Sequence, residues 1–182
     1  MPAKGICGSG LIDAAAVLRQ SGVLDAEGSL QREGHPFRAM VCEIGGAPAV
    51  RFAGTGVLLT QADIRALQVA KAAVCAGLQM LLDRAESGRK VGKAFLAGGF
   101  GRFIRLEVRR RSACFPPLYW EGPLHRQRGV RWGGPARPAA SRRERLLSLV
   151  GRIHTVSLAE EPAFEQAYLE GMRFPNENYM GR

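Results

Sequence analysis

Residues 93–102, KAFLAGGFGR, constrain the fold of this chain more than any other stretch. Residues 94–97 form an apolar run with the length and composition of a short buried strand. Gly98, Gly99 and Gly101 follow it directly. Glycine has no Cβ and adopts positive φ, so a strand that ends on glycines lets a ligand come close to the backbone. In open α/β sheets, ligands bind at the carboxyl ends of the strands. The stretch therefore predicts a ligand-binding turn or, equally well, a tight strand-to-helix turn without a ligand.

A long helix is predicted over residues 60–84. Thr60 and Asp63 predict a capping box at its start, with Asp in place of the usual Glu or Gln. Apolar residues then recur at helical spacing, at Ile64, Leu67, Val74, Leu78, Leu81 and Leu82. This stripe is expected to be the buried face of the helix.

The same helix carries a second, polar stripe. Arg65, Gln68 and Lys71 follow one another at intervals of three residues. By itself such a stripe predicts a helix face in contact with solvent. A helix, a turn, the strand and its glycine turn in succession predict a piece of an α/β domain.

A glycine loop near the start of the chain precedes another predicted helix, over residues 11–20. Gly8, Ser9 and Gly10 belong to this loop, and Ser9 is the expected N-cap. The helix is expected to stop at Gly22. Free backbone N–H groups at a helix N-terminus suit a phosphate or another anion, although close packing of the helix start explains the glycines as well. Because such loops usually follow a strand, we expect a preceding strand that this chain does not include.

The rest of the sequence gives weaker signals for secondary structure than the two helices above. Short strands are expected at residues 49–53 and 57–59, on either side of a glycine turn. Towards the end of the chain we expect a helix through residues 146–150, a strand at 153–158 and a helix at 162–172.

The net charge of +10 is concentrated in residues 105–145, where eleven arginines and three glutamates give +8. Tyr119, Trp120 and Trp132 lie among these arginines, as in surfaces that combine stacking with charge. Binding of a nucleic acid or another polyanion by this stretch is therefore an alternative function. A basic binding face is normally spread over a fold rather than confined to one stretch of sequence, so we predict no nucleic-acid partner.

Composition argues against several classes of protein. The four cysteines are each more than thirty residues apart, which excludes a CxxC zinc or iron–sulfur pattern within the chain and favours reduced, structural thiols. No apolar run approaches about 20 residues and no basic leader precedes a cleavage site, so we expect a cytoplasmic protein without a membrane segment. Neither a metal-ligand set nor a catalytic residue stands out, because Asp13 and Asp63 have local explanations in their helices.

Four stretches together resemble one family, the reductive activators of corrinoid proteins. The stretches are GICGSGLID at 5–13, LTQADIR at 59–65 followed by QVAK at 68–71, LAGGFG at 96–101, and Phe164 with MRFP at 172–175. The C-terminal half of these activators is an actin-like (ASKHA) ATPase domain. The resemblance implies an α/β fold, namely part of an actin-like, ribonuclease H-like lobe with a mixed sheet and flanking helices.

The same resemblance divides the chain. Residues 1–107 and 141–175 fit one lobe of the ATPase domain, and residues 176–182 form a tail. Residues 108–140 do not fit, and we expect them to be an irregular segment rich in arginine and proline.

The resemblance also implies a function. Such activators carry an N-terminal [2Fe–2S] ferredoxin-like domain and use ATP to drive an electron onto a Co(II) corrinoid, which restores Co(I) for methyl transfer. ATP with Mg²⁺ is the implied ligand and a corrinoid protein the implied partner. A homodimer is compatible with the resemblance, and so is another actin-like ATPase or activator with a different acceptor.

The family's motifs assign candidate nucleotide contacts in this chain. The glycine turn Gly98, Gly99 and Gly101 would carry the adenosine motif, and Arg65, Gln68 and Lys71 would line the adenosine side. Gly8, Ser9 and Gly10 are candidate glycine-loop contacts. The [2Fe–2S] ligands and the family's first phosphate loop are absent from the chain, and half of a two-lobed clamp leaves phosphate charge uncompensated. We therefore expect a fragment that is incomplete as an enzyme on its own.

We hypothesise that residues 108–140 are a frameshifted stretch. This segment holds five of the ten prolines and shows no period, and the family's IGLLP-like stretch is missing from it. The codons ATC GGC CTG CTT CCC encode Ile-Gly-Leu-Leu-Pro. Read one base later, they encode Ser-Ala-Cys-Phe and, if another C follows, proline, which is the sequence at 112–116.

We predict that independent sequencing of the gene will reveal a shift of frame before residue 112 and its reversal before residue 141. Restoring the frame should recover an IGLLP-like stretch. An uninterrupted frame in independent reads, with the codons for Ser112–Pro116 intact, would remove the hypothesis.

Overall fold

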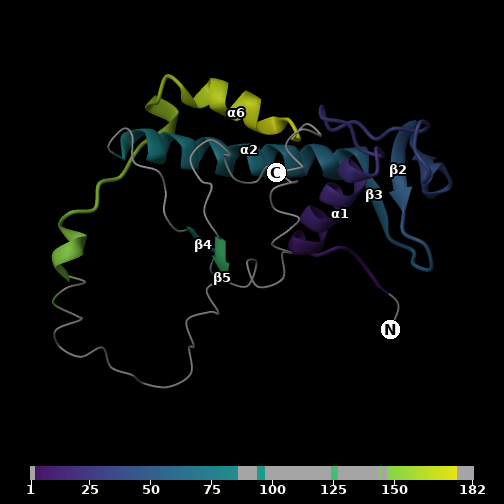
Figure 1. Ribbon diagram of the computed structural model, residues 1–182, viewed down its shortest axis with the longest axis horizontal. Helices are drawn as coiled ribbons and strands as arrows, with labels where there is room; N and C mark the ends of the chain where they lie inside the picture. The colour runs from purple at the N-terminus through teal and green to yellow at the C-terminus, as the bar shows by residue number, and fades with distance from the viewer. Residues whose placement is uncertain (1–2, 86–93, 97–123, 127–143, 145–146, 176–182) are drawn as a thin grey trace, which may run out of the picture.

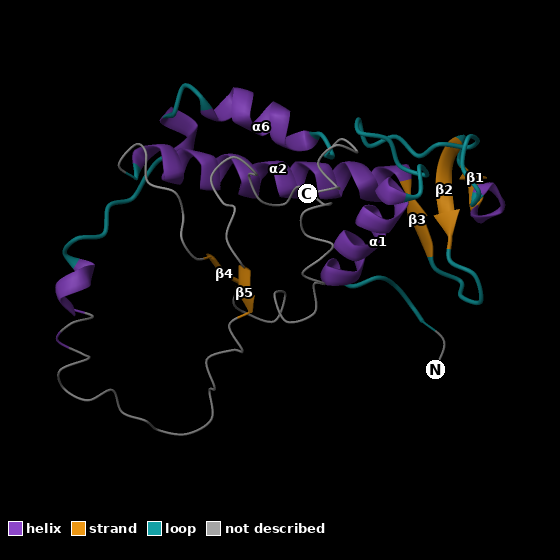
Figure 2. Cartoon of the chain, in the orientation of Figure 1, coloured by secondary structure: helices purple, strands orange, loops and turns teal. Residues whose placement is uncertain are grey.

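The computed structural model describes residues 3–85, 94–96, 124–126, 144 and 147–175. One long helix, α2, organises them, with α6 alongside it and α1 packed near its N-terminal end (Figure 1). A small three-stranded sheet lies at the same end (Figure 2). The mixed α/β class predicted from the sequence is confirmed.

Helix α2 spans Gln61–Arg84 and begins as predicted. The Asp63 backbone N–H donates to Thr60 Oγ1 at 3.2 Å, and the Thr60 N–H donates to the Asp63 carboxylate at 2.8 Å. These reciprocal bonds satisfy donors that a helix start otherwise leaves without partners.

Helix α1 spans Gly8–Gln20, and its N-cap is Cys7 rather than Ser9. The prediction of Ser9 as N-cap is wrong because the helix starts before it: Ser9 lies in the first turn, 7% exposed, with its hydroxyl 3.3 Å from Cys7 Sγ. The end of the helix is as predicted, with Gly22 at φ +77° after the last turn.

The three-stranded sheet consists of β1 (Val41–Ile44), β2 (Ala47–Arg51) and β3 (Leu58–Thr60), in that order and antiparallel. The sequence indicated β2 and β3 but missed β1, which follows the short 3₁₀ helix η1 (Arg38–Met40). The turn between β1 and β2 is formed by two glycines, both at positive φ, which permits a tight reversal.

The central strand of the sequence pattern is β4 (Ala94–Leu96), and it pairs in parallel with β5 (Leu124–Arg126). Strand β5 falls inside residues 108–140, so the expectation of an irregular segment missed it. The glycines that follow β4 lie outside the described residues.

The C-terminal part of the described chain contains the 3₁₀ helix η3 (Leu158–Glu160) and α6 (Phe164–Met172). The start of helix α6 was predicted two residues too early, at residue 162 rather than 164, and its end at residue 172 was predicted correctly. The strand predicted at 153–158 is wrong: residues 153–157 are irregular and Ile153 is 68% exposed, so this β-branched run has no sheet to join among the described residues.

The core lies between α1, the small sheet and the first half of α2. It contains the buried side chains of Ile12, Ala15, Leu18, Val23, Leu24, Leu30, Val50, Leu59, Ile64, Leu67 and Phe174. Phe174 is only 2% exposed, although it is separated from the rest of the core by more than a hundred residues of sequence. The segment after α6 therefore completes the core of the N-terminal elements.

The buried face of α2 agrees with the predicted one at Ile64 and Leu67 but differs from it further along the helix. Val74 and Leu81 are 51% and 52% exposed, whereas Gln68 and Lys71 are 4% and 3% exposed. Helix α6 packs along this face, and its Gly171 comes so close that a Cβ there would lie 3.1 Å from Ala72 Cα. The polar stripe that the sequence assigns to solvent is therefore largely buried.

Helix α2 also has the length and mean hydropathy of a helix that could cross a membrane, with a value of 1.2 in its most apolar window. One such helix is weak evidence, because the central helix of a soluble domain has the same properties. Its contacts with α6 and the core suit that second role.

Candidate functional site

Gln68 connects three parts of the chain. Its side-chain N–H₂ donates to the carbonyl of Glu27 at 3.0 Å and to the carbonyl of Met172 at 2.9 Å. Its Oε1 accepts a hydrogen bond from Arg65 at 2.8 Å. A buried amide is tolerated when its donors and acceptor are satisfied, as they are here.

Lys71 lies one turn further along α2 and is directed to the end of α6. Its Nζ donates to the carbonyls of Gly171 and Arg173, the latter at 2.6 Å, and lies 5.0 Å from the centre of the Phe174 ring. A cation near a helix C-terminus is favoured by the carbonyls left without partners there. The burial of this ammonium therefore depends on the position of the residues after α6.

Arg19 of α1 holds the same part of the chain from the other side. Its Nε donates to the Pro175 carbonyl at 3.1 Å, while the Phe174 N–H donates to the Ala26 carbonyl at 2.8 Å. We call residues 171–175 the C-terminal segment. Its main chain is held by side chains of α1 and α2 and by the loop that follows α1.

Arg65 differs from Gln68 and Lys71 because it is exposed. Its guanidinium donates to the Glu27 carbonyl at 2.7 Å, to Gln68 Oε1 at 2.8 Å and to Ser29 Oγ at 3.2 Å. These bonds use Nη1 and Nη2, so among the described residues Nε keeps its N–H available. An oriented and exposed guanidinium suits an anionic or polar ligand.

The predicted glycine-loop contacts lie at the start of α1. Gly8 is the first helical residue, Ser9 is buried in the first turn, and Gly10 packs near Ile6 and Cys7. No side chain caps this helix start. Packing and anion binding thus both remain compatible with the three residues.

Cys7 has an unusual environment that the sequence did not single out. Its thiol is exposed, and the Ser9 hydroxyl, followed by the Gly10 backbone, lowers the pKa of this thiol below its ordinary value by hydrogen bonding to the thiolate. The signal available in the sequence was a cysteine directly before a helix start.

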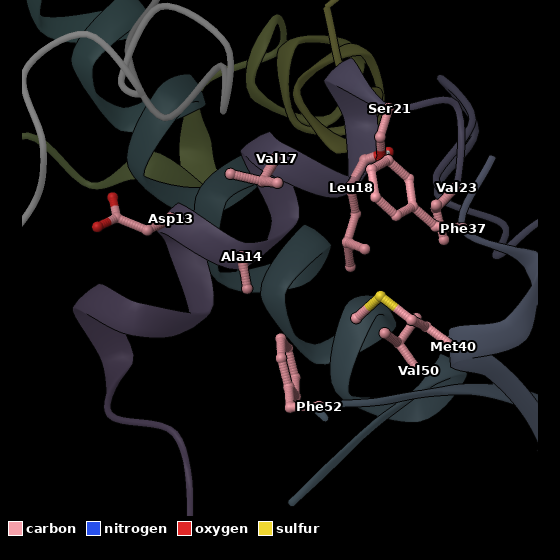
Figure 3. Close-up of a pocket in the computed structure, with 10 residues that line it drawn as sticks. All are labelled: Asp13, Ala14, Val17, Leu18, Ser21, Val23, Phe37, Met40, Val50 and Phe52. Atoms are coloured by element: carbon pink, nitrogen blue, oxygen red, sulfur yellow. Dashed lines mark hydrogen bonds between the residues drawn. The ribbon is translucent and has the colours of Figure 1, made fainter. Parts of the chain in front are cut away.

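A pocket of about 330 Å³ opens between α1 and the small sheet (Figure 3). Its walls are the side chains of Asp13, Ala14, Val17, Leu18, Ser21, Val23, Phe37, Met40, Val50 and Phe52. Phe52 and Met40 face α1 across the pocket, and the Asp13 carboxylate points away from them. Its mostly apolar walls and its one acidic group do not suit a nucleotide phosphate.

Of the candidate nucleotide contacts, Arg65, Gln68 and Lys71 come together on one stretch of α2. Gly98, Gly99 and Gly101 lie outside the described residues, so their assignment stays a prediction. In the described ranges, no three His, Cys, Asp or Glu side chains are grouped so that they could hold a metal ion.

The profile of one family, described as the C-terminal domain of RACo, the ASKHA domain, matches residues 1–181. The chain belongs to this family. The family resemblance of the four sequence motifs is thereby confirmed.

Two relatives of this ASKHA family are informative. The corrinoid activation enzyme RamQ of Eubacterium limosum is 27% identical over 191 residues, which cover 94% of this chain and 31% of the relative. A solved structure, the reductive activator for corrinoid, iron-sulfur protein, superposes with a TM-score of 0.68 at 20% identity, over 97% of this chain and 29% of that one. The chain thus shares the fold of that structure and spans about a third of the length of either relative.

An alanine substitution at Gly28 tests how much the contacts of Gln68 contribute to the stability of the fold. Gly28 has φ +80°, and a Cβ there would overlap the Gln68 side-chain amide. Gly34 is a matched control, with φ +83° and nothing within 4 Å of its Cβ position. We expect Gly34→Ala to lower the free energy of unfolding by about 1 kcal/mol through backbone strain alone.

Gly28→Ala should lower the free energy of unfolding by a further amount of about 1–3 kcal/mol, because it displaces the buried Gln68 amide from its hydrogen bonds to the Glu27 and Met172 carbonyls. Urea denaturation of both variants measures the difference. Equal losses would show that the contacts of Gln68 contribute nothing to stability.

Proposed function

We propose that this ASKHA domain acts within an ATP-dependent reductive activator of corrinoid proteins. Membership of the family and the likeness to RamQ over 94% of the chain support this proposal. In the proposed reaction, one electron passes to the cobalt of a corrinoid protein in the cytoplasm, so that Co(II) becomes Co(I). A [2Fe–2S] centre supplies that electron in the proposed whole activator.

The described residues offer no site for this cluster. The described cysteines Cys7, Cys42 and Cys75 form no disulfide, and the described residues offer no group of metal ligands. Since the chain matches 31% of RamQ, we assign electron transfer to parts of the activator that correspond to the other regions of such relatives. We therefore propose that the present chain is a fragment whose task is to bind the nucleotide.

The proposed nucleotide site combines the glycine turn after β4 with the polar stripe of α2. Gly98, Gly99 and Gly101 would admit the adenosine to bare backbone, and Mg²⁺ would accompany the phosphates. Arg65 fits the role of a direct contact, because its guanidinium is exposed and held in orientation by three acceptors. Gln68 and Lys71 can reach the same ligand only after the C-terminal segment moves, because both are almost fully buried.

We expect Arg65→Ala to weaken the binding of Mg-ATP by about ten-fold or more, since a hydrogen bond between charged groups contributes about 1.5–3 kcal/mol. Isothermal titration calorimetry on the full chain measures the dissociation constant. Arg32→Ala is the control, because it removes another exposed arginine, which pairs with Glu43 at 2.9 Å.

The control should leave the dissociation constant within about two-fold of the original, because exposed ion pairs contribute little. If Arg65→Ala binds Mg-ATP as tightly as the control, Arg65 is not a nucleotide contact. If the unmodified chain binds no Mg-ATP, the proposed ATP dependence of this chain is wrong.

A further inference from the structure

The C-terminal segment occupies the side chains that the proposed nucleotide site needs. Lys71 gives two of its donors to the carbonyls of Gly171 and Arg173, and the Phe174 ring covers its ammonium. Gln68 gives one N–H to the Met172 carbonyl. Because Lys71 and Gln68 are only 3% and 4% exposed, no ligand can contact them while these bonds persist.

We propose that the C-terminal segment is an autoinhibitory strap, which competes with the nucleotide for Lys71 and Gln68. This inference rests on the proposed function, since it concerns the regulation of the same site. The two occupants offer similar chemistry: backbone carbonyls in the closed state and ribose hydroxyls or phosphate oxygens in the open state accept hydrogen bonds from the same donors. A cationic donor such as Lys71 forms its stronger hydrogen bonds with the charged phosphate oxygens.

The contacts that hold the strap closed are of a kind that contacts with a ligand can replace. They are main-chain hydrogen bonds at the end of α6, one buried aromatic side chain and an exposed ion pair between Arg173 and Glu27. The strap comprises the last two residues of α6 and the three that follow, so its release breaks the Arg19–Pro175 hydrogen bond and removes Phe174 from the core. Loss of Phe174 from the core would oppose release and keep the closed state dominant without a ligand.

Competition has a reciprocal consequence. If the nucleotide binds only the open state, then Mg-ATP opens the strap, and a weakened strap strengthens the binding of Mg-ATP by the same factor. The affinity for Mg-ATP can therefore rise at most by the inverse of the fraction of molecules whose strap is open without a ligand.

Hydrogen exchange of the Phe174 amide reports directly on the strap, because this N–H donates to the Ala26 carbonyl at 2.8 Å. The experiment compares exchange of the full chain with and without saturating Mg-ATP, followed by NMR. We expect Mg-ATP to accelerate exchange at Phe174 by at least about ten-fold. Amides of the paired strands β1 and β2 serve as the internal reference and should not change.

Glu27→Gln weakens the strap by removing the charge of one exposed ion pair, Arg173–Glu27, whose side chains are 65% and 61% exposed. It keeps the Glu27 backbone carbonyl that accepts hydrogen bonds from Arg65 and Gln68. It should therefore fold and bind Mg-ATP up to about five-fold more tightly. Glu43→Gln removes the comparable exposed pair with Arg32, which lies outside the strap, and should leave binding unchanged.

The outcomes separate this inference from the proposed function. If Mg-ATP binds and exchange at Phe174 stays constant or slows, the strap does not compete and the inference is overturned, while ATP binding stands. If neither the unmodified chain nor Glu27→Gln binds Mg-ATP, both are overturned.

Discussion

The described structure depends on the burial of one ammonium group. Lys71 is 3% exposed, and an unpaired charge at such a position would be strongly destabilising. The carbonyls of Gly171 and Arg173 and the ring of Phe174 make the position tolerable. Because these partners lie at the end of α6 and just after it, the C-terminal segment must pack against α2 before α2 can bury its polar stripe. The same contacts bring Phe174 into the core of the N-terminal elements.

Local signals in the sequence predicted the local structure well. Thr60 with Asp63 marked the start of α2, and Gly22 marked the end of α1, because capping bonds and positive φ depend on neighbouring residues. The buried face of α2 was predicted correctly at Ile64 and Leu67, but Val74, Leu81, Gln68 and Lys71 were predicted wrongly for the opposite reason. Gln68 and Lys71 find their acceptors about a hundred residues away, and no period within the helix reports such distant partners.

The same reasoning applies to the candidate site. The sequence motifs brought Arg65, Gln68 and Lys71 together as one group, and the structure divides that group by exposure. One exposed guanidinium faces outward, while two buried donors hold the end of α6. The nucleotide site proposed above would give this division a meaning, because a nucleotide and a peptide main chain both present oxygen acceptors to such donors. A site of this kind can be controlled by the chain that carries it.

A double-mutant cycle between Lys71 and Phe174 tests the central claim most directly. Lys71→Met and Phe174→Leu each remove one side of the contact at 5.0 Å and keep an apolar side chain in place. Urea denaturation of the two single variants and the double variant gives the coupling free energy. We predict a favourable coupling of about 0.5–2 kcal/mol, the range for a desolvated cation over an aromatic ring. Additive losses would contradict the claim that the buried ammonium and the Phe174 ring stabilise one another.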